Sequence, residues 1–156
     1  MDEPGRGVSP PLAAFFATAG FGALGVFGFG FTSLLGEQDV IATPGLSQGP
    51  GIVAMLLSVV VFALTIWTAV RGGRYASAFW VAVATAAAYP AGIAVGAVFQ
   101  GVDPAKAAGA AGGFALSWFM VVLLAAAGVA AWCGVALVRT RSSRPQWPWE
   151  KDDDED

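Results

Sequence analysis

Apolar residues fill four long stretches of the chain, and charged residues are confined to the segments between and beyond them. The stretches comprise residues 8–35, 51–70, 75–99 and 107–138, and none of them contains a charged residue. A hydrocarbon core about 30 Å thick is crossed by on the order of 20 helical residues. Because the stretches lack the alternation of a membrane β-strand, the pattern predicts an all-α integral membrane protein with four transmembrane helices.

Proline and turn residues mark where three of these helices should begin. In each case a cap or turn residue is followed by proline, which is favoured at the first helical position: Ser9-Pro10, Gly49-Pro50 and Asp103-Pro104. The short Arg71-Gly72-Gly73-Arg74 connection makes the second and third stretches antiparallel neighbours. We therefore expect an antiparallel bundle with short loops.

The fourth stretch is too long for a simple crossing. A continuous helix from Pro104 to Arg139 rises about 1.5 Å per residue and overshoots the hydrocarbon core. Either its first turns lie at the outer interface, as far as Gly112-Gly113, or the helix tilts. We favour the interfacial start.

Basic residues predict the orientation of the chain. All but one fall on the same side of the predicted spans, at Arg6, Arg71, Arg74, Arg139, Arg141, Arg144 and Lys151, whereas Lys106 lies on the other side. Cytoplasmic segments carry the excess of Lys and Arg, so both termini are expected in the cytoplasm. The chain then divides into a short cytoplasmic N-terminus (1–7), a transmembrane domain (8–141) and a disordered acidic cytoplasmic tail (142–156).

Composition supports the membrane class and excludes several kinds of site. The chain is 56% hydrophobic and 12% charged, against about 25% charged in an average soluble domain. Six acids between Glu150 and Asp156 produce the net charge of −3, so nucleic acid is not an expected partner. With Cys133 as the single cysteine and no histidine, we expect no disulfide, no metal site and no cofactor. Richness in Ala, Gly and Val is typical of a GC-rich bacterium, which favours the bacterial plasma membrane.

Small residues recur at helical spacing in three of the stretches. Membrane helices associate where small residues let their backbones approach. The candidate packing or interface positions are Gly22, Gly25 and Gly28, then Ala84, Ala88, Gly92 and Gly96, and finally Gly109 and Gly113. They either pack inside the bundle or contact a partner or another copy, and both interpretations stay open. The stretch 51–70 has few small residues and is expected to face lipid.

Chemistry-bearing groups are scarce within the spans. No ionisable acid or base lies there, and hydroxyls such as Ser58, Thr65, Thr85 and Ser117 do not form a catalytic set, so the chain is not predicted to be an enzyme. Pro90 should bend the third helix, as a helix kink that shapes packing or acts as a hinge. The external acids, Glu37, Asp39 and Asp103, are interpreted as solvated loop residues, with a weak cation site as the alternative.

The tail contains two tryptophans separated by a proline. Trp147 and Trp149 precede the acidic end, and this composition builds no core. The two tryptophans either rest on the membrane interface or form a docking motif for a partner, with the acids steering association.

These observations favour a non-catalytic role. The leading hypothesis is an accessory, assembly or scaffold subunit of a larger bacterial membrane complex, respiratory or cell-envelope. Its partners would be the lipid bilayer and other membrane protein subunits, or further copies of the chain. The alternative is a small homo-oligomeric channel or transporter, in which several span hydroxyls should face a common cavity.

Overall fold

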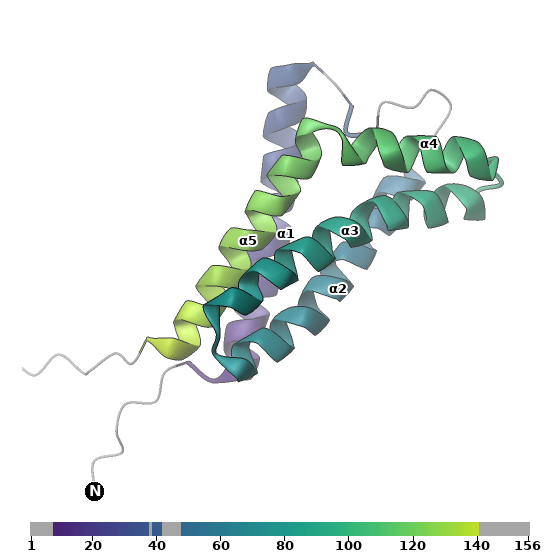
Figure 1. Cartoon of the computed structure of the whole chain (residues 1–156). Helices are drawn as coiled ribbons and strands as arrows, with labels where there is room; N and C mark the ends of the chain where they lie inside the picture. Colours follow the sequence, from purple (N-terminus) through teal and green to yellow (C-terminus); the bar gives the residue numbers. More distant parts are fainter. Residues whose placement is uncertain (1–7, 38, 42–47, 141–156) are drawn as a thin grey trace, which may run out of the picture.

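Five α-helices form the part of the chain that the computed structural model describes, residues 8–37, 39–41 and 48–140. They are α1 (Pro10–Gly36), α2 (Gly49–Gly72), α3 (Tyr75–Phe99), α4 (Pro104–Ala115) and α5 (Trp118–Arg139), shown in Figure 1. These ranges contain no strand. Four helices, α1, α2, α3 and α5, are long and apolar enough to cross a membrane. The prediction of an all-helical chain with four long apolar helices is confirmed.

Three helices begin where the sequence places proline, and α2 ends at a glycine. Prolines occupy the first turns of α1, α2 and α4, as expected. At the start of α4 the Asp103 carboxylate accepts hydrogen bonds from the backbone amides of Ala105 (2.9 Å) and Lys106 (3.3 Å). These amides have no acceptor within the helix, so Asp103 caps it. Gly73 closes α2 in the left-handed region (φ 59°), where its amide donates to Ala69 and the chain turns directly into α3.

The predicted single span over 107–138 is wrong, because the structure divides it into α4 and α5. Ser117 adopts an extended conformation between the two helices, and its hydroxyl donates to the Phe114 carbonyl at 2.7 Å. Figure 1 shows α4 lying across one end of the bundle and α5 descending from it. The 22 residues of α5 are about 33 Å long, enough for one crossing. The excess length forms a separate helix that extends beyond the expected Gly112-Gly113 boundary.

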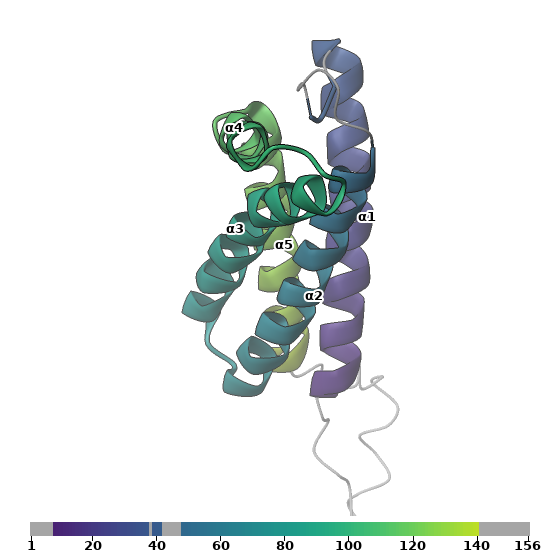
Figure 2. The same cartoon turned by 90° about the vertical axis from the view of Figure 1, so that its right-hand side faces the viewer.

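The long helices alternate in direction. The start of α1, the α2–α3 turn and the end of α5 meet at one end of the molecule, at the bottom of Figures 1 and 2. We call this the arginine end, because Arg71, Arg74 and Arg139 lie there. The Arg139 guanidinium sits 4.7 Å from the centre of the Tyr75 ring, which joins the end of α5 to the start of α3. The opposite end, where α4 lies, is called the α4 end.

One face of α2 is central to the core, contrary to the expectation that 51–70 faces lipid. Ala54, Ser58, Phe62 and Ile66, spaced four residues apart, have no exposed surface. The Phe62 ring stacks on Phe21 of α1 with ring centres 4.6 Å apart. The other face of α2, including Ile52, Leu56 and Leu64, is exposed. The helix is therefore two-sided.

Candidate functional site

The small residues of α3 lie against α2. A Cβ atom placed on Gly92 would meet the Ala54 Cα at 2.5 Å, and one on Gly96 would meet the Pro50 Cα at 2.9 Å. Ala88 is buried and Ala84 half-buried on the same helix. The two glycines thus bring the α2 and α3 backbones together, as small residues do between membrane helices. The helix continues through Pro90 without interruption, and the kink there stays a prediction.

The glycines of α1 have three different surroundings. A Cβ on Gly25 would meet the Met55 side chain of α2 at 3.0 Å, and one on Gly28 would meet Val122 of α5 at 2.6 Å. A Cβ on Gly22 would meet nothing within 4 Å in the described ranges. Of the three predicted packing positions, Gly25 therefore packs against α2, Gly28 packs against α5, and Gly22 faces open space in the described chain.

The glycines of α4 face open space in the described part of the chain. One face of this helix is buried, through Ala107, Ala110 and Phe114. Its opposite face is exposed and, apart from Lys106 at its edge, is made of small residues: Ala105, Ala108, Gly109, Gly112 and Gly113. We call this the Ala/Gly face. A Cβ on any of its three glycines would meet no atom of the described residues within 4 Å.

Sequence reasoning missed two features of the packing. Gly134 of α5 faces α1, and a Cβ there would lie 2.8 Å from the Ala17 Cβ. Four aromatic rings gather where α4 meets the bundle, with Tyr89 and Phe114 stacked at 4.4 Å and Phe29 at right angles to Phe114, Tyr89 and Phe119. Helical spacing alone gave no signal for this cluster, because its members come from four helices.

The five hydroxyl residues that a channel path was expected to use, Ser58, Thr65, Thr85, Tyr89 and Ser117, do not share a cavity in the described residues. Thr65 and Thr85 donate to carbonyls one turn back, Val61 and Val81, both at 2.7 Å. The buried Ser58 hydroxyl has no hydrogen-bond partner in the part of the chain that is described. Among the hydroxyl residues considered, Tyr89 lines a pocket at the α4 end and Ser117 lines a different one. The arrangement expected for a solvated path is therefore absent from the described residues.

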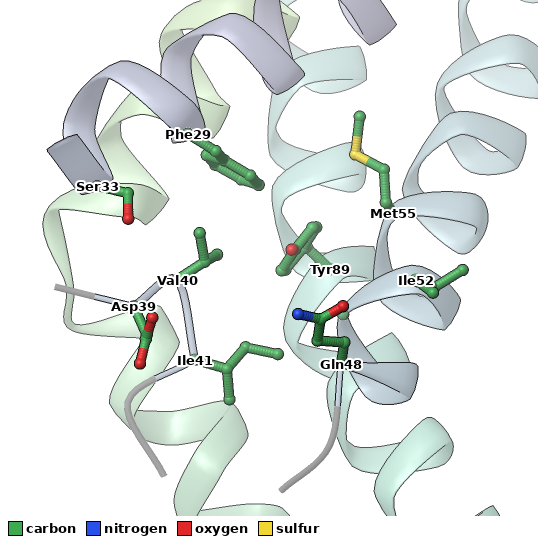
Figure 3. Close-up of a pocket in the computed structure, with 10 residues that line it drawn as sticks. Phe29, Ser33, Asp39, Val40, Ile41, Gln48, Ile52, Met55 and Tyr89 are labelled. Carbon is green, nitrogen blue, oxygen red and sulfur yellow. The ribbon is translucent and has the colours of Figure 1, made fainter.

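A pocket with both polar and apolar lining residues lies between α1, the segment after it, and the start of α2. It has a volume of about 500 Å³. Figure 3 shows Tyr89 of α3 at its centre, between Asp39 on one side and Ile52 and Met55 on the other. We call this cavity the outer pocket, and its lining residues are Phe29, Ser33, Asp39, Val40, Ile41, Gln48, Gly51, Ile52, Met55 and Tyr89.

The remaining predicted positions do not form a site that the structure describes. Of the acids, Asp39 lines the outer pocket and Asp103 caps α4, and no three His, Cys, Asp or Glu side chains come together within the described ranges. Trp147 and Trp149, with the segments 1–7 and 142–156, lie outside the described residues.

Comparison with known proteins gives a family but no activity. The model of a family described as "Family of unknown function (DUF6121)" matches residues 10–156. This match includes all five helices. No curated protein and no solved structure matches the chain.

Proposed function

Because the chain belongs to DUF6121, a family of unknown function, we propose a role from its own structure. The proposal is a non-catalytic multi-pass protein of the bacterial plasma membrane that serves as an accessory or assembly subunit of a larger membrane complex. Four apolar helices long enough to cross a bilayer support the insertion. Their exposed faces carry large apolar side chains such as Phe27, Leu64 and Val129, which lipid would cover.

The proposed orientation places the arginine end in the cytoplasm. Arg71, Arg74 and Arg139 lie there, whereas Lys106 is on α4 at the opposite end. Trp67 and Tyr75 contact the Arg71 and Arg139 guanidinium groups, a pairing suited to the headgroup layer. In this orientation α4 would lie along the outer membrane surface.

The observation that carries the accessory role is the uncovered Ala/Gly face of α4. Glycine in a helix costs roughly 0.5–1 kcal/mol relative to alanine, because it loses more backbone freedom on folding. α4 has exposed glycines at three of its 12 positions, and none allows a close approach within the described chain. A helix of a partner lying on this face would use the space and explain the glycines.

The shape of the Ala/Gly face fits a helical partner. Gly109 and Gly113 are four residues apart, the spacing at which two helix backbones can approach closely. Leu116 and Trp118 follow the last residue of α4 and are 92% and 76% exposed. They would supply apolar anchors beside the glycine groove, as large side chains do at interfaces.

The channel alternative has less support. It needs hydroxyls or other polar groups along one continuous path, whereas Thr65 and Thr85 donate to their own helices. The centre of the bundle is instead closed by apolar groups, with Phe21, Phe62 and Leu123 fully buried.

A purification experiment tests the accessory role. The tagged protein is isolated from its native membrane in mild detergent, and co-purifying proteins are identified by mass spectrometry. We expect a reproducible larger complex that is lost in the double variant Gly109→Leu/Gly113→Leu. Because nothing in the described chain contacts these positions, the variant should keep its circular dichroism spectrum and expression level.

The matched control is Gly30→Leu, at an exposed position of α1 that is also free of contacts within 4 Å in the described chain. It should retain the complex. Recovery of all partners by the α4 variant would refute the role of the Ala/Gly face. A wild-type protein that purifies only as a homo-oligomer and moves a solute in liposomes would overturn the accessory role in favour of the channel.

Reporter fusions test the orientation separately. Alkaline phosphatase, which is active only outside the cytoplasm, is joined after Gly101 or after Thr140. We expect strong activity at Gly101 and little at Thr140. The reverse pattern would show that the arginine end is external.

A further inference from the structure

We propose that the outer pocket is a binding site for an amphiphilic amine, held by its cationic group at Asp39, by its apolar body against Ile52 and Met55, and by the hydroxyl of Tyr89. Its volume of about 500 Å³ lies within the range of roughly 300–1,000 Å³ typical of small-molecule sites. The inference does not depend on the accessory role or on the orientation proposed above.

The Tyr89 hydroxyl is the observation that points to a ligand. Tyr89 is only 3% exposed, and its ring is fixed between Phe114, stacked at 4.4 Å, and Phe29, at right angles and 5.4 Å away. Its hydroxyl makes no hydrogen bond to any residue in the described ranges and belongs to the lining of the pocket. The oxygen borders the cavity, so whatever fills the pocket supplies its hydrogen-bond partner. A polar atom of a ligand in the pocket would satisfy it.

The wall opposite Asp39 selects an apolar body. Ile52 and Met55 come from successive turns of α2 and border the cavity together with Phe29 (Figure 3). Water filling this space would have to cover these apolar groups, which is unfavourable. A hydrocarbon or aromatic group of the ligand would instead be buried against them. Methionine adapts its shape to such groups.

Charge distinguishes an amine from an acid. Asp39 is the one ionisable side chain in the lining other than Tyr89, and it forms no ion pair with a described residue. The arginines of the described chain are at the far end of the bundle, and Lys106 does not line the pocket. An anionic headgroup would therefore be repelled by the one charged side chain in the described lining. A cation would pair with Asp39 and could also lie over an aromatic ring.

Binding of three matched probes tests the site. Purified protein in dodecyl maltoside micelles is titrated with 4-phenylbutylamine, 4-phenylbutyrate and 4-phenylbutan-1-ol, and binding is followed by saturation-transfer NMR with empty micelles as the blank. We expect the amine to bind at least about tenfold more tightly than the acid, with the alcohol between them, from the usual strength of charge-assisted hydrogen bonds. Equal binding of amine and acid would overturn the proposal.

Three variants assign the contacts. Asp39→Asn should remove the preference for binding the amine over the alcohol. Tyr89→Phe should weaken the binding of the amine and of the alcohol by a similar factor of about three to ten. Glu37→Gln, which alters a neighbouring acid outside the pocket lining, should change nothing. Because Asp39 is exposed, its variant should fold, and unchanged amine binding by Asp39→Asn would refute the site even if Tyr89→Phe proved unstable.

Native mass spectrometry distinguishes the two possible sources of the amine. A retained aminolipid that 4-phenylbutylamine displaces would identify a lipid headgroup as the natural ligand. Absence of retained lipid, together with amine binding, would identify a free amphiphile from solution. Both outcomes support the proposal, whereas displacement of a retained lipid that has no amino group would contradict it.

Discussion

The backbone of Gly92 in α3 lies directly against Ala54 in α2, so that a Cβ atom at position 92 would stand 2.5 Å from the Ala54 Cα. Ala54 has no exposed surface and belongs to the buried face of α2. One turn further along α3, Gly96 meets Pro50 in the same manner. Lipid tails are as apolar as leucine side chains, so the hydrophobic effect does not drive two helices together inside a membrane. Close packing of the two backbones is therefore what holds α2 to α3.

Gly92→Ala should therefore destabilise the protein. The added methyl group meets backbone atoms that cannot rotate away, and overpacking of this kind costs about 1–3 kcal/mol, which exceeds the gain in helix propensity of about 1 kcal/mol. The free energy of unfolding is measured by SDS titration in detergent micelles with circular dichroism. Gly109→Ala is the control, because its methyl group meets open space and should leave stability unchanged or raise it by up to about 1 kcal/mol. Equal effects of the two substitutions would contradict the prediction.

Gly134 and Ala17 provide a paired test of the α1–α5 contact. A Cβ at position 134 would lie 2.8 Å from the Ala17 Cβ, so Gly134→Ala alone should lower the free energy of unfolding by about 1–2 kcal/mol. Adding Ala17→Gly removes the opposing methyl group and should recover most of this loss. The double-mutant cycle is measured by the same SDS titration, and simple additivity of the two substitutions would show that the methyl groups do not meet.

Ser58→Ala should stabilise the protein by about 1 kcal/mol or leave its stability unchanged. The Ser58 hydroxyl is fully buried and has no hydrogen-bond partner within the described residues, and removing such a group relieves a desolvation cost. Thr85→Val is the matched comparison, because the equally buried Thr85 hydroxyl donates to Val81 at 2.7 Å. This substitution should give no stabilisation. A clear loss of stability in Ser58→Ala, measured by SDS titration, would indicate that the hydroxyl has a partner.

Phe114→Ala should release α4 from the bundle while leaving the four long helices folded. Phe114 is the large buried side chain of α4, and it stacks on Tyr89 and meets Phe29 edge-on. Loss of a buried Phe costs about 3–5 kcal/mol, which a 12-residue helix with three glycines cannot offset by itself. Hydrogen exchange should rise over residues 104–115 and stay low in α3. The comparison is Leu116→Ala, an exposed position where no such change is expected. Exchange that rises equally in α3 would mean that the whole bundle had loosened.

The sequence alone determined the four apolar helices and most of their ends. Apolar runs of 20 or more residues leave helices as the main way to satisfy the backbone in lipid, and the prolines after Ser9, Gln48-Gly49 and Asp103 mark helix starts by their own stereochemistry. These properties are local, so they can be read without knowing which helices touch. The break at Ser117 is different. Residues 114–118 contain no Gly or Pro that would mark a helix end. The turn at Ser117 lies next to Phe114, which packs on Tyr89 and Phe29.

Tertiary structure decided what each glycine pair does. Gly92 with Gly96 and Gly109 with Gly113 have the same four-residue spacing, yet the first pair is pressed against α2 and the second faces open space in the described chain. It also placed Asp39 of a loop beside Tyr89 of a span, far apart in sequence, in one pocket. Spacing along a helix states which residues share a face. Only the positions of the other helices determine what that face meets.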